Sequence, residues 1–219
     1  ENWREYIRRF NENDEETTVQ AVPNEKAEEW VEREVPFFDC PDPVLEETWY
    51  FRWWVFRKHI KDTGRGRIIT EFLPRVPWAG PYNSINGANG HHIAEARWLK
   101  QDRNIVREYL AFWLRGEGQE TSYSSWLADT VYQYALVSGE KALAVDFLPG
   151  LVSFYESVEA FNLTKYGLFW SYDDRDAMEL SISGSGLRPT LNSYMYGNAA
   201  AIAAIAEWAG KEEIRELYN

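Results

Sequence analysis

The segment 173–179 concentrates acidic side chains in a way that could support acid catalysis. Four carboxylates fall within seven residues, with Arg175 among them. A crowded or partly buried carboxyl group has a raised pKa and can protonate a leaving group. Calcium binding and a solvated acidic turn are the alternatives. Because Trp170, Met178 and Ile182 lie within or beside the acids, the pattern favours a segment that folds inward over a solvated turn.

A second candidate is the segment 86–98, NGANGHHIAEARW. If a helix begins near His91, then His91, Glu95 and Trp98 share one face at positions i, i+4 and i+7. That face could hold the hydroxyl groups of a ligand against an indole ring. A zinc site is not indicated, because His91 and His92 would point to different faces and no HExxH spacing occurs. Histidines satisfied at the start of a helix are the alternative interpretation.

The loop 76–83, VPWAGPYN, is the third candidate. It presents Trp78 and Tyr82 on a backbone stiffened by proline, which reduces the ordering entropy lost on binding. Aromatic rings on such a loop are typical of a platform that stacks on a sugar. Packing within the loop explains the same residues equally well.

Composition limits the classes of partner. The chain has 219 residues, and 11 Trp, 13 Tyr and 11 Phe make 16% of it aromatic, which suits both a packed core and stacking on sugars. The formal net charge of −12 repels phosphate backbones and anionic lipid, so we expect neither nucleic acid nor a membrane as partner. No metal or other cofactor is indicated. The chain begins with Glu1 and carries no leader pattern, so we expect the natural N-terminus to lie upstream or to have been removed.

Helical segments dominate the expected secondary structure. Pro43 at a first helical position opens a helix to about Lys61 that is apolar on nearly every face, as expected of a helix packed on two sides. The other expected helices cover residues 2–13, 23–34, 91–114, a serine-capped segment to 137, 141–161 with a kink or break at Pro149, 190–209 and 211–218. Residues 67–72 are expected to be extended.

Two long loops, 73–90 and 166–189, separate these helices, while the other turns are short and rich in glycine. Long loops in a compact domain are usually functional. Helical hairpins whose loops alternate between short and long are typical of a ring in which one set of loops carries the chemistry. We therefore predict an all-α fold with hairpins arranged as an (α/α)6 toroid, and a plain helical bundle is the alternative.

The order of these features resembles the six-hairpin glycosidases with (α/α)6 barrels, which include trehalases and the mannosylglycerate-hydrolase-like group. The resemblance rests on Met178-Glu179-Leu180-Ser181 followed by the helix start at 190–196, TLNSYMY, and it covers roughly Pro36 to Tyr218. Ser124-Ser125-Trp126 resembles the start of the preceding helix, Phe147-Leu148-Pro149 resembles the next helix, and His91 to Leu99 falls where the family carries its substrate-holding helix.

The resemblance implies an inverting glycoside hydrolase in which Glu179 stands where the family has its general-acid Asp, with Asp176 as the reserve acid. A full toroid of about twelve helices exceeds this chain. We therefore expect one incomplete catalytic domain over 1–219, with 1–35 as a possible helical lead-in. The catalytic base and the remaining part of the barrel would then lie beyond Asn219.

The expected partner is a carbohydrate substrate. The residues expected to contact it are Trp78, Tyr82, Asn83, His91, His92, Glu95, Arg97, Trp98, Trp126, Arg175, Arg188 and Asn192. Two other functions remain open: a non-catalytic carbohydrate-binding helical module, and a sugar epimerase or lyase on a similar toroid with His91 or His92 as acid or base.

Overall fold

The computed structural model describes residues 2–176, 178–182 and 184–219, and these residues are mostly helical. The chain divides into two compact units. Unit 1 comprises Glu1–Ser84 and Trp98–Tyr109, and unit 2 comprises Ile85–Arg97 and Leu110–Asn219. The predicted all-α class is confirmed.

Unit 1 is built around helix α3 (Pro43–Lys58), which contacts α1 (Asn2–Glu12) and α2 (Ala27–Glu34). Asp42 caps α3, because its carboxylate accepts a hydrogen bond of 2.9 Å from the Val44 amide, and Pro43 occupies the first turn. Aromatic rings fill the contacts: Trp3 and Tyr50 stack with centroids 6.3 Å apart. The prediction that α3 packs on two sides is confirmed.

The end of α3 differs from the expectation. The helix stops at Lys58, and Ile60–Asp62 forms strand β1, which pairs antiparallel with β2 (Arg67–Ile69) so that Ile60 lies opposite Ile69. The local sequence pattern predicts a helix to residue 61, but it carries no information on the pairing of β1 with β2, which lies on the other side of the turn at 63–66. Of the stretch expected to be extended, residues 67–69 are strand.

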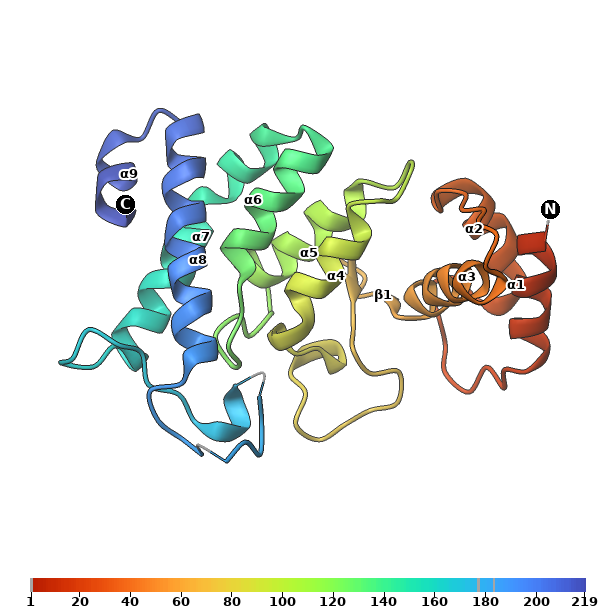
Figure 1. Ribbon diagram of the computed structural model, residues 1–219, viewed down its shortest axis with the longest axis horizontal. Helices are drawn as coiled ribbons and strands as arrows, with labels where there is room; N and C mark the ends of the chain where they lie inside the picture. The colour runs from red at the N-terminus through yellow and green to blue at the C-terminus, as the bar shows by residue number, and fades with distance from the viewer. Residues whose placement is uncertain (1, 177, 183) are drawn as a thin grey trace. The chain divides into compact units, whose positions relative to one another are not determined.

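Unit 2 is an arrangement of helices in which α8 (Pro189–Trp208) is central. In Figure 1, α8 runs beside α7 (Lys141–Asn162) and α9 (Glu212–Tyr218), and it also contacts α6 (Leu127–Ser138). The alanine-rich part of α8, from 199 to 206, includes several buried residues, whose small side chains allow a neighbouring backbone to pack closely. Pro149 lies inside α7 without ending it.

The expected helix 91–114 is two helices. Helix α4 covers Asn89–Ala96, and α5 covers Asn104–Arg115. Within unit 1, the buried carboxylate of Glu34 accepts hydrogen bonds from the amides of Gln101 (3.2 Å) and Asp102 (2.8 Å), which takes these amides out of any helix. His91 and Glu95 both lie on α4, but the prediction that Trp98 shares their face is wrong, because the helix ends before Trp98.

Candidate functional site

The acidic segment lies on a loop that is closed at its base. Two isolated bridges, Leu163 with Phe169 and Ser171 with Gly186, hold the chain after α7. The amides of Ser171 and Gly186 donate to each other's carbonyl oxygens at 2.8 and 2.9 Å. The acidic residues therefore lie on a loop tip bounded by the second bridge and returning directly into α8.

Arg188, the residue before α8, holds this tip from inside. Its guanidinium donates to the carboxylate of Asp176, to that of Asp173 at 2.5 Å, and to the carbonyl oxygens of Met178 at 2.6 Å and Gly184 at 2.5 Å. The Arg188 side chain is only 3% exposed. The hydrogen bond to Asp176 raises the pKa of Arg188, so the cation is maintained.

Glu179 is exposed, but the backbone on both sides of it is fixed. Before it, the Met178 carbonyl accepts from Arg188. After it, the Leu180 amide donates to Asp173 at 3.0 Å, and Leu180 has a φ of 57°, which is left-handed backbone that a leucine rarely adopts. The carboxylate of Glu179 is thus presented to solvent from a constrained turn. Ala177 and Ser183 fall outside the described residues.

Asp176 points inward instead. It is fully buried, one carboxylate oxygen is bonded to Arg188, and Oδ1 has no hydrogen-bond partner within the described part of the chain. Burial, with a contribution from the nearby Asp176 charge, raises the pKa of Tyr194. The Tyr194 ring lies 4.8 Å from that of Trp126, which in turn meets His91 edge to face at 4.6 Å. Unit 2 therefore brings the acidic loop, an aromatic pair and the histidine-bearing helix together.

The position of Trp126 follows from its close contacts with α4. A Cβ added at Gly90 would lie 2.3 Å from the indole, so only glycine allows this approach. Beside it, the hydroxyl of Ser125 donates to the side-chain oxygen of Asn89 at 2.7 Å, and both residues are buried. These contacts fix Trp126 against the first turn of the histidine helix.

Helix α6 starts after Trp126 without the predicted serine cap. Its first amides, those of Ala128 and Asp129, donate instead to the side-chain oxygen of Asn198 at 3.0 and 3.3 Å. The Asn198 amide nitrogen donates to the Ser125 carbonyl at 2.9 Å. A fully buried residue on α8 thus caps α6, and residue spacing near 125 carries no signal for it.

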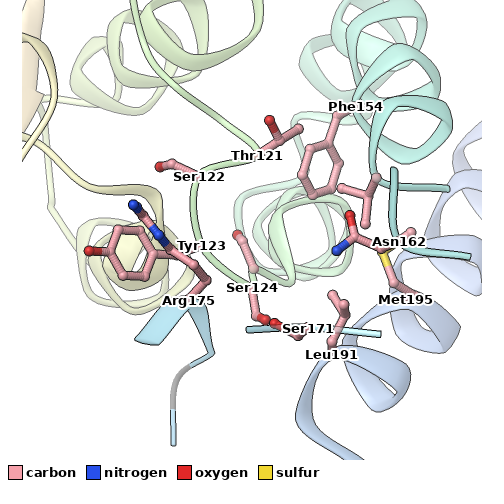
Figure 2. A pocket seen from close by; sticks show the side chains of 12 residues that line it. Thr121, Ser122, Tyr123, Ser124, Phe154, Asn162, Ser171, Arg175, Leu191 and Met195 are labelled. Carbon is pink, nitrogen blue, oxygen red and sulfur yellow. The ribbon is translucent and has the colours of Figure 1, made fainter. Parts of the chain in front are cut away.

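A small polar cavity of about 40 Å³ lies in unit 2 (Figure 2). Its polar lining consists of Thr121, Ser122, Ser124, Ser125, Asn162, Ser171 and Arg175. The volume suits one or two water molecules and no sugar ring. The Ser124 hydroxyl is buried without a hydrogen-bond partner in the described residues, as expected where water completes the bonding. The amide nitrogen of Asn162 donates to the Trp170 carbonyl at 2.8 Å.

The remaining expected contact residues divide between the units. Trp78, Tyr82, Asn83 and Trp98 belong to unit 1. There Trp78 and Trp98 are largely exposed, while the Asn83 amide donates to the carbonyls of Phe72 and Pro74 and so supports its own loop. This loop keeps Tyr82 and Asn83 at φ values of 55° and 64°.

In unit 2, Arg175 lies over the ring of Tyr123 (Figure 2). The guanidinium carbon is 5.2 Å from the ring centroid, and Arg175 is exposed. Asn192 is bonded to the backbone of Phe169 in both directions, at 2.9 and 2.8 Å, and therefore joins the loop to α8. Three further residues on or directly after α4 are partly buried: His92, Glu95 and Arg97. The sequence analysis did not predict Tyr194, Asn198 or Asn89 as site residues. For Tyr194, the only sequence signal was an aromatic residue directly after the Asn192-Ser193 pair.

Within the described ranges, no group of three or more His, Cys, Asp and Glu side chains is arranged to hold a metal ion. No described helix combines the length and the apolar character needed to cross a bilayer.

The described residues thus define an all-α chain whose acidic loop returns directly into α8. The sequence profile of the mannosylglycerate hydrolase MGH1-like glycoside hydrolase domain matches residues 81–219, which is more than half of the chain. The chain belongs to this family. The predicted resemblance to the mannosylglycerate-hydrolase-like group is therefore confirmed.

A solved structure described as a sialidase is similar to the whole chain, with a TM-score of 0.93 and 41% sequence identity over 98% of this chain. The match covers 20% of that protein, so the chain spans about a fifth of its length. The search of curated proteins found no match.

Proposed function

We propose that the longer protein to which this chain belongs hydrolyses a glycosidic bond with inversion, and that Glu179 is its general acid. The observation that carries the proposal is the arrangement in unit 2: the Arg175 carbonyl of the acidic loop accepts from the Ser124 amide at 2.9 Å, two residues before Trp126, whose ring contacts those of Tyr194 and His91. A loop that carries acids beside partly exposed aromatic rings is suited to a sugar whose leaving oxygen must be protonated.

Glu179 suits the role of donor better than Asp176. Its side chain is exposed, and it extends from backbone that is anchored before and after it. Asp176 is fully buried and gives one oxygen to Arg188, which leaves it poorly placed to reach a leaving group. Asp176 remains the reserve acid.

The proposal extends to the domain. We infer that residues 1–219 form the first part of a catalytic (α/α)6 ring whose remaining helices complete it and supply the base. Inversion requires the two carboxyl groups to lie about 6.5 to 9.5 Å apart, so that a water molecule fits between the base and the sugar. The chain spans about a fifth of the similar solved structure, which supports a site completed by further chain.

The test compares Glu179→Gln and Asp176→Asn in the longer protein, using a panel of disaccharides and aryl glycosides. Glu179→Gln is expected to lower turnover of unactivated substrates by about 100-fold or more while binding, followed by calorimetry, is retained. Glu156→Gln is the matched control, because Glu156 is exposed on α7 in the same unit. The anomer released first, read by NMR, tests inversion.

Unaltered turnover in Glu179→Gln would overturn the acid role, and a large loss in Asp176→Asn alone would transfer it to Asp176. If the wild-type longer protein binds sugars but hydrolyses none of the panel, the carbohydrate-binding function replaces the hydrolase.

A further inference from the structure

We propose that Arg188 is a positioning residue for the general acid, acting through the backbone on both sides of Glu179, and that it is not a substrate ligand. The inference rests on the proposed function, since it assumes that Glu179 donates the proton. It assigns to Arg188 a role different from the substrate contact expected from the sequence.

The hydrogen bonds of Arg188 are the first argument. A guanidinium has five N–H groups. Arg188 directs its bonds to Asp173, Asp176, Met178 and Gly184, all of which belong to the loop tip. The group is 3% exposed. A buried guanidinium bonded on several sides to the protein has little capacity left for a substrate hydroxyl.

Charge is the second argument. Asp173 and Asp176 both pair with the same cation, and Asp176 is fully buried. Without the cation, two neighbouring carboxylates would repel each other, and one of them would be an uncompensated buried charge. Arg188 is therefore required for the loop to close with both acids turned inward.

The path to Glu179 is short. Arg188 fixes the carbonyl of Met178, one residue before Glu179. Through Asp173 it also fixes the amide of Leu180, one residue after. Leu180 is kept in the left-handed region, which is unfavourable for a leucine and must be offset by these bonds. When the bonds are lost, Leu180 can relax to ordinary backbone angles and carry Glu179 away from its position.

The same residue connects the loop to the rest of the site. Arg188 directly precedes Pro189 at the start of α8, and Tyr194 lies on the second turn of that helix beside Trp126. A displacement of the guanidinium therefore changes the position of Glu179 relative to the Trp126 and Tyr194 rings. Lysine cannot replace this function, because an ammonium is a point charge and lacks the planar fork that reaches several acceptors at once.

The experiment measures kcat and KM for Arg188→Lys and Arg188→Met in the longer protein, with two leaving groups. One is an unactivated alcohol that requires protonation, and the other is a dinitrophenolate that departs without it. A misplaced acid harms only the first reaction. We expect Arg188→Lys to lower kcat by about 100-fold on the unactivated substrate, with little change in KM, and by less than about 3-fold on the activated one.

Arg115→Lys is the matched control, since Arg115 is a half-exposed arginine paired with Asp146 in the same unit, and no change is expected. Combining Arg188→Lys with Glu179→Gln should add little to the loss from Glu179→Gln, because both changes remove the same proton transfer. If Arg188→Met fails to fold, Arg188→Lys, which keeps the charge, decides the matter.

The outcomes separate the two proposals. Equal losses on both substrates would mean a purely structural role and would overturn the positioning proposal. A raised KM with unchanged kcat would make Arg188 a substrate ligand and would overturn it as well. If Glu179→Gln itself leaves the unactivated reaction intact, the proposed acid fails independently of Arg188.

Discussion

We predict that Asn198 stabilises the N-terminus of α6 by capping it, although Asn198 lies some seventy residues further along the chain. Its side chain accepts hydrogen bonds from the amides of Ala128 and Asp129 and donates one to the Ser125 carbonyl. Replacement by alanine removes all three bonds in a fully buried position.

The expected magnitude follows from the bonds that are lost. Removing a helix N-cap costs about 0.5 to 2 kcal/mol. Leaving a buried carbonyl without its donor costs about 1 to 3 kcal/mol. The two sites are in contact, so the costs overlap, and Asn198→Ala should lower the free energy of unfolding by about 2 to 4 kcal/mol.

Urea unfolding measures the loss, and hydrogen exchange at the amides of Ala128 and Asp129 shows whether it is located at α6. Asn198→Asp keeps the accepting oxygens, but it buries a negative charge and places an oxygen against the Ser125 carbonyl, so it should lose at least as much as Asn198→Ala. The control is Tyr196→Ala on the same helix, where the side chain is 81% exposed and a change within about 0.5 kcal/mol is expected.

A loss in Asn198→Ala below about 0.5 kcal/mol, or unchanged exchange at the two amides, would refute the reasoning. It would mean that water or a neighbouring group replaces the cap without cost.

Two further predictions concern the same unit. Gly90→Ala should lower the free energy of unfolding by about 1 to 3 kcal/mol and shift the tryptophan fluorescence, because the new Cβ would lie 2.3 Å from Trp126. Gly197→Ala is the control and should be neutral or stabilising, because the nearest atom to its new Cβ lies at 3.9 Å. Equal effects of the two substitutions would contradict the prediction. Burial raises the pKa of Asp129, so the folded state binds the carboxyl proton more tightly than the unfolded state does. The contribution of Asp129 to stability therefore falls as pH rises above about 3.9, the ordinary pKa of an aspartic acid. Asp129→Asn should therefore gain stability relative to wild type between about pH 3 and about pH 7 in urea unfolding, and a constant difference across this range would be inconsistent with the buried acid.

The sequence by itself determined the features that depend on neighbouring residues. The helix start at Pro43 follows from the backbone geometry of one or two residues, and the predicted start at residue 190 lies one residue from the observed start of α8 at Pro189. The acidic loop and the histidine-bearing segment were found from composition. The helical class followed from hydrophobic periodicity, which is a local property, and the glycoside hydrolase family followed from the resemblance carried by residues 178–181 and 190–196.

The tertiary structure alone decided the features whose partners are distant in the chain. Glu34 interrupts the helix expected at 91–114, and Asn198 replaces the serines as the cap of α6. Arg188 turns Asp176 inward and leaves Glu179 exposed, although both acids lie in one short run. In each case a buried polar group had to find a partner, and which residue supplied it depended on packing rather than on spacing along the chain.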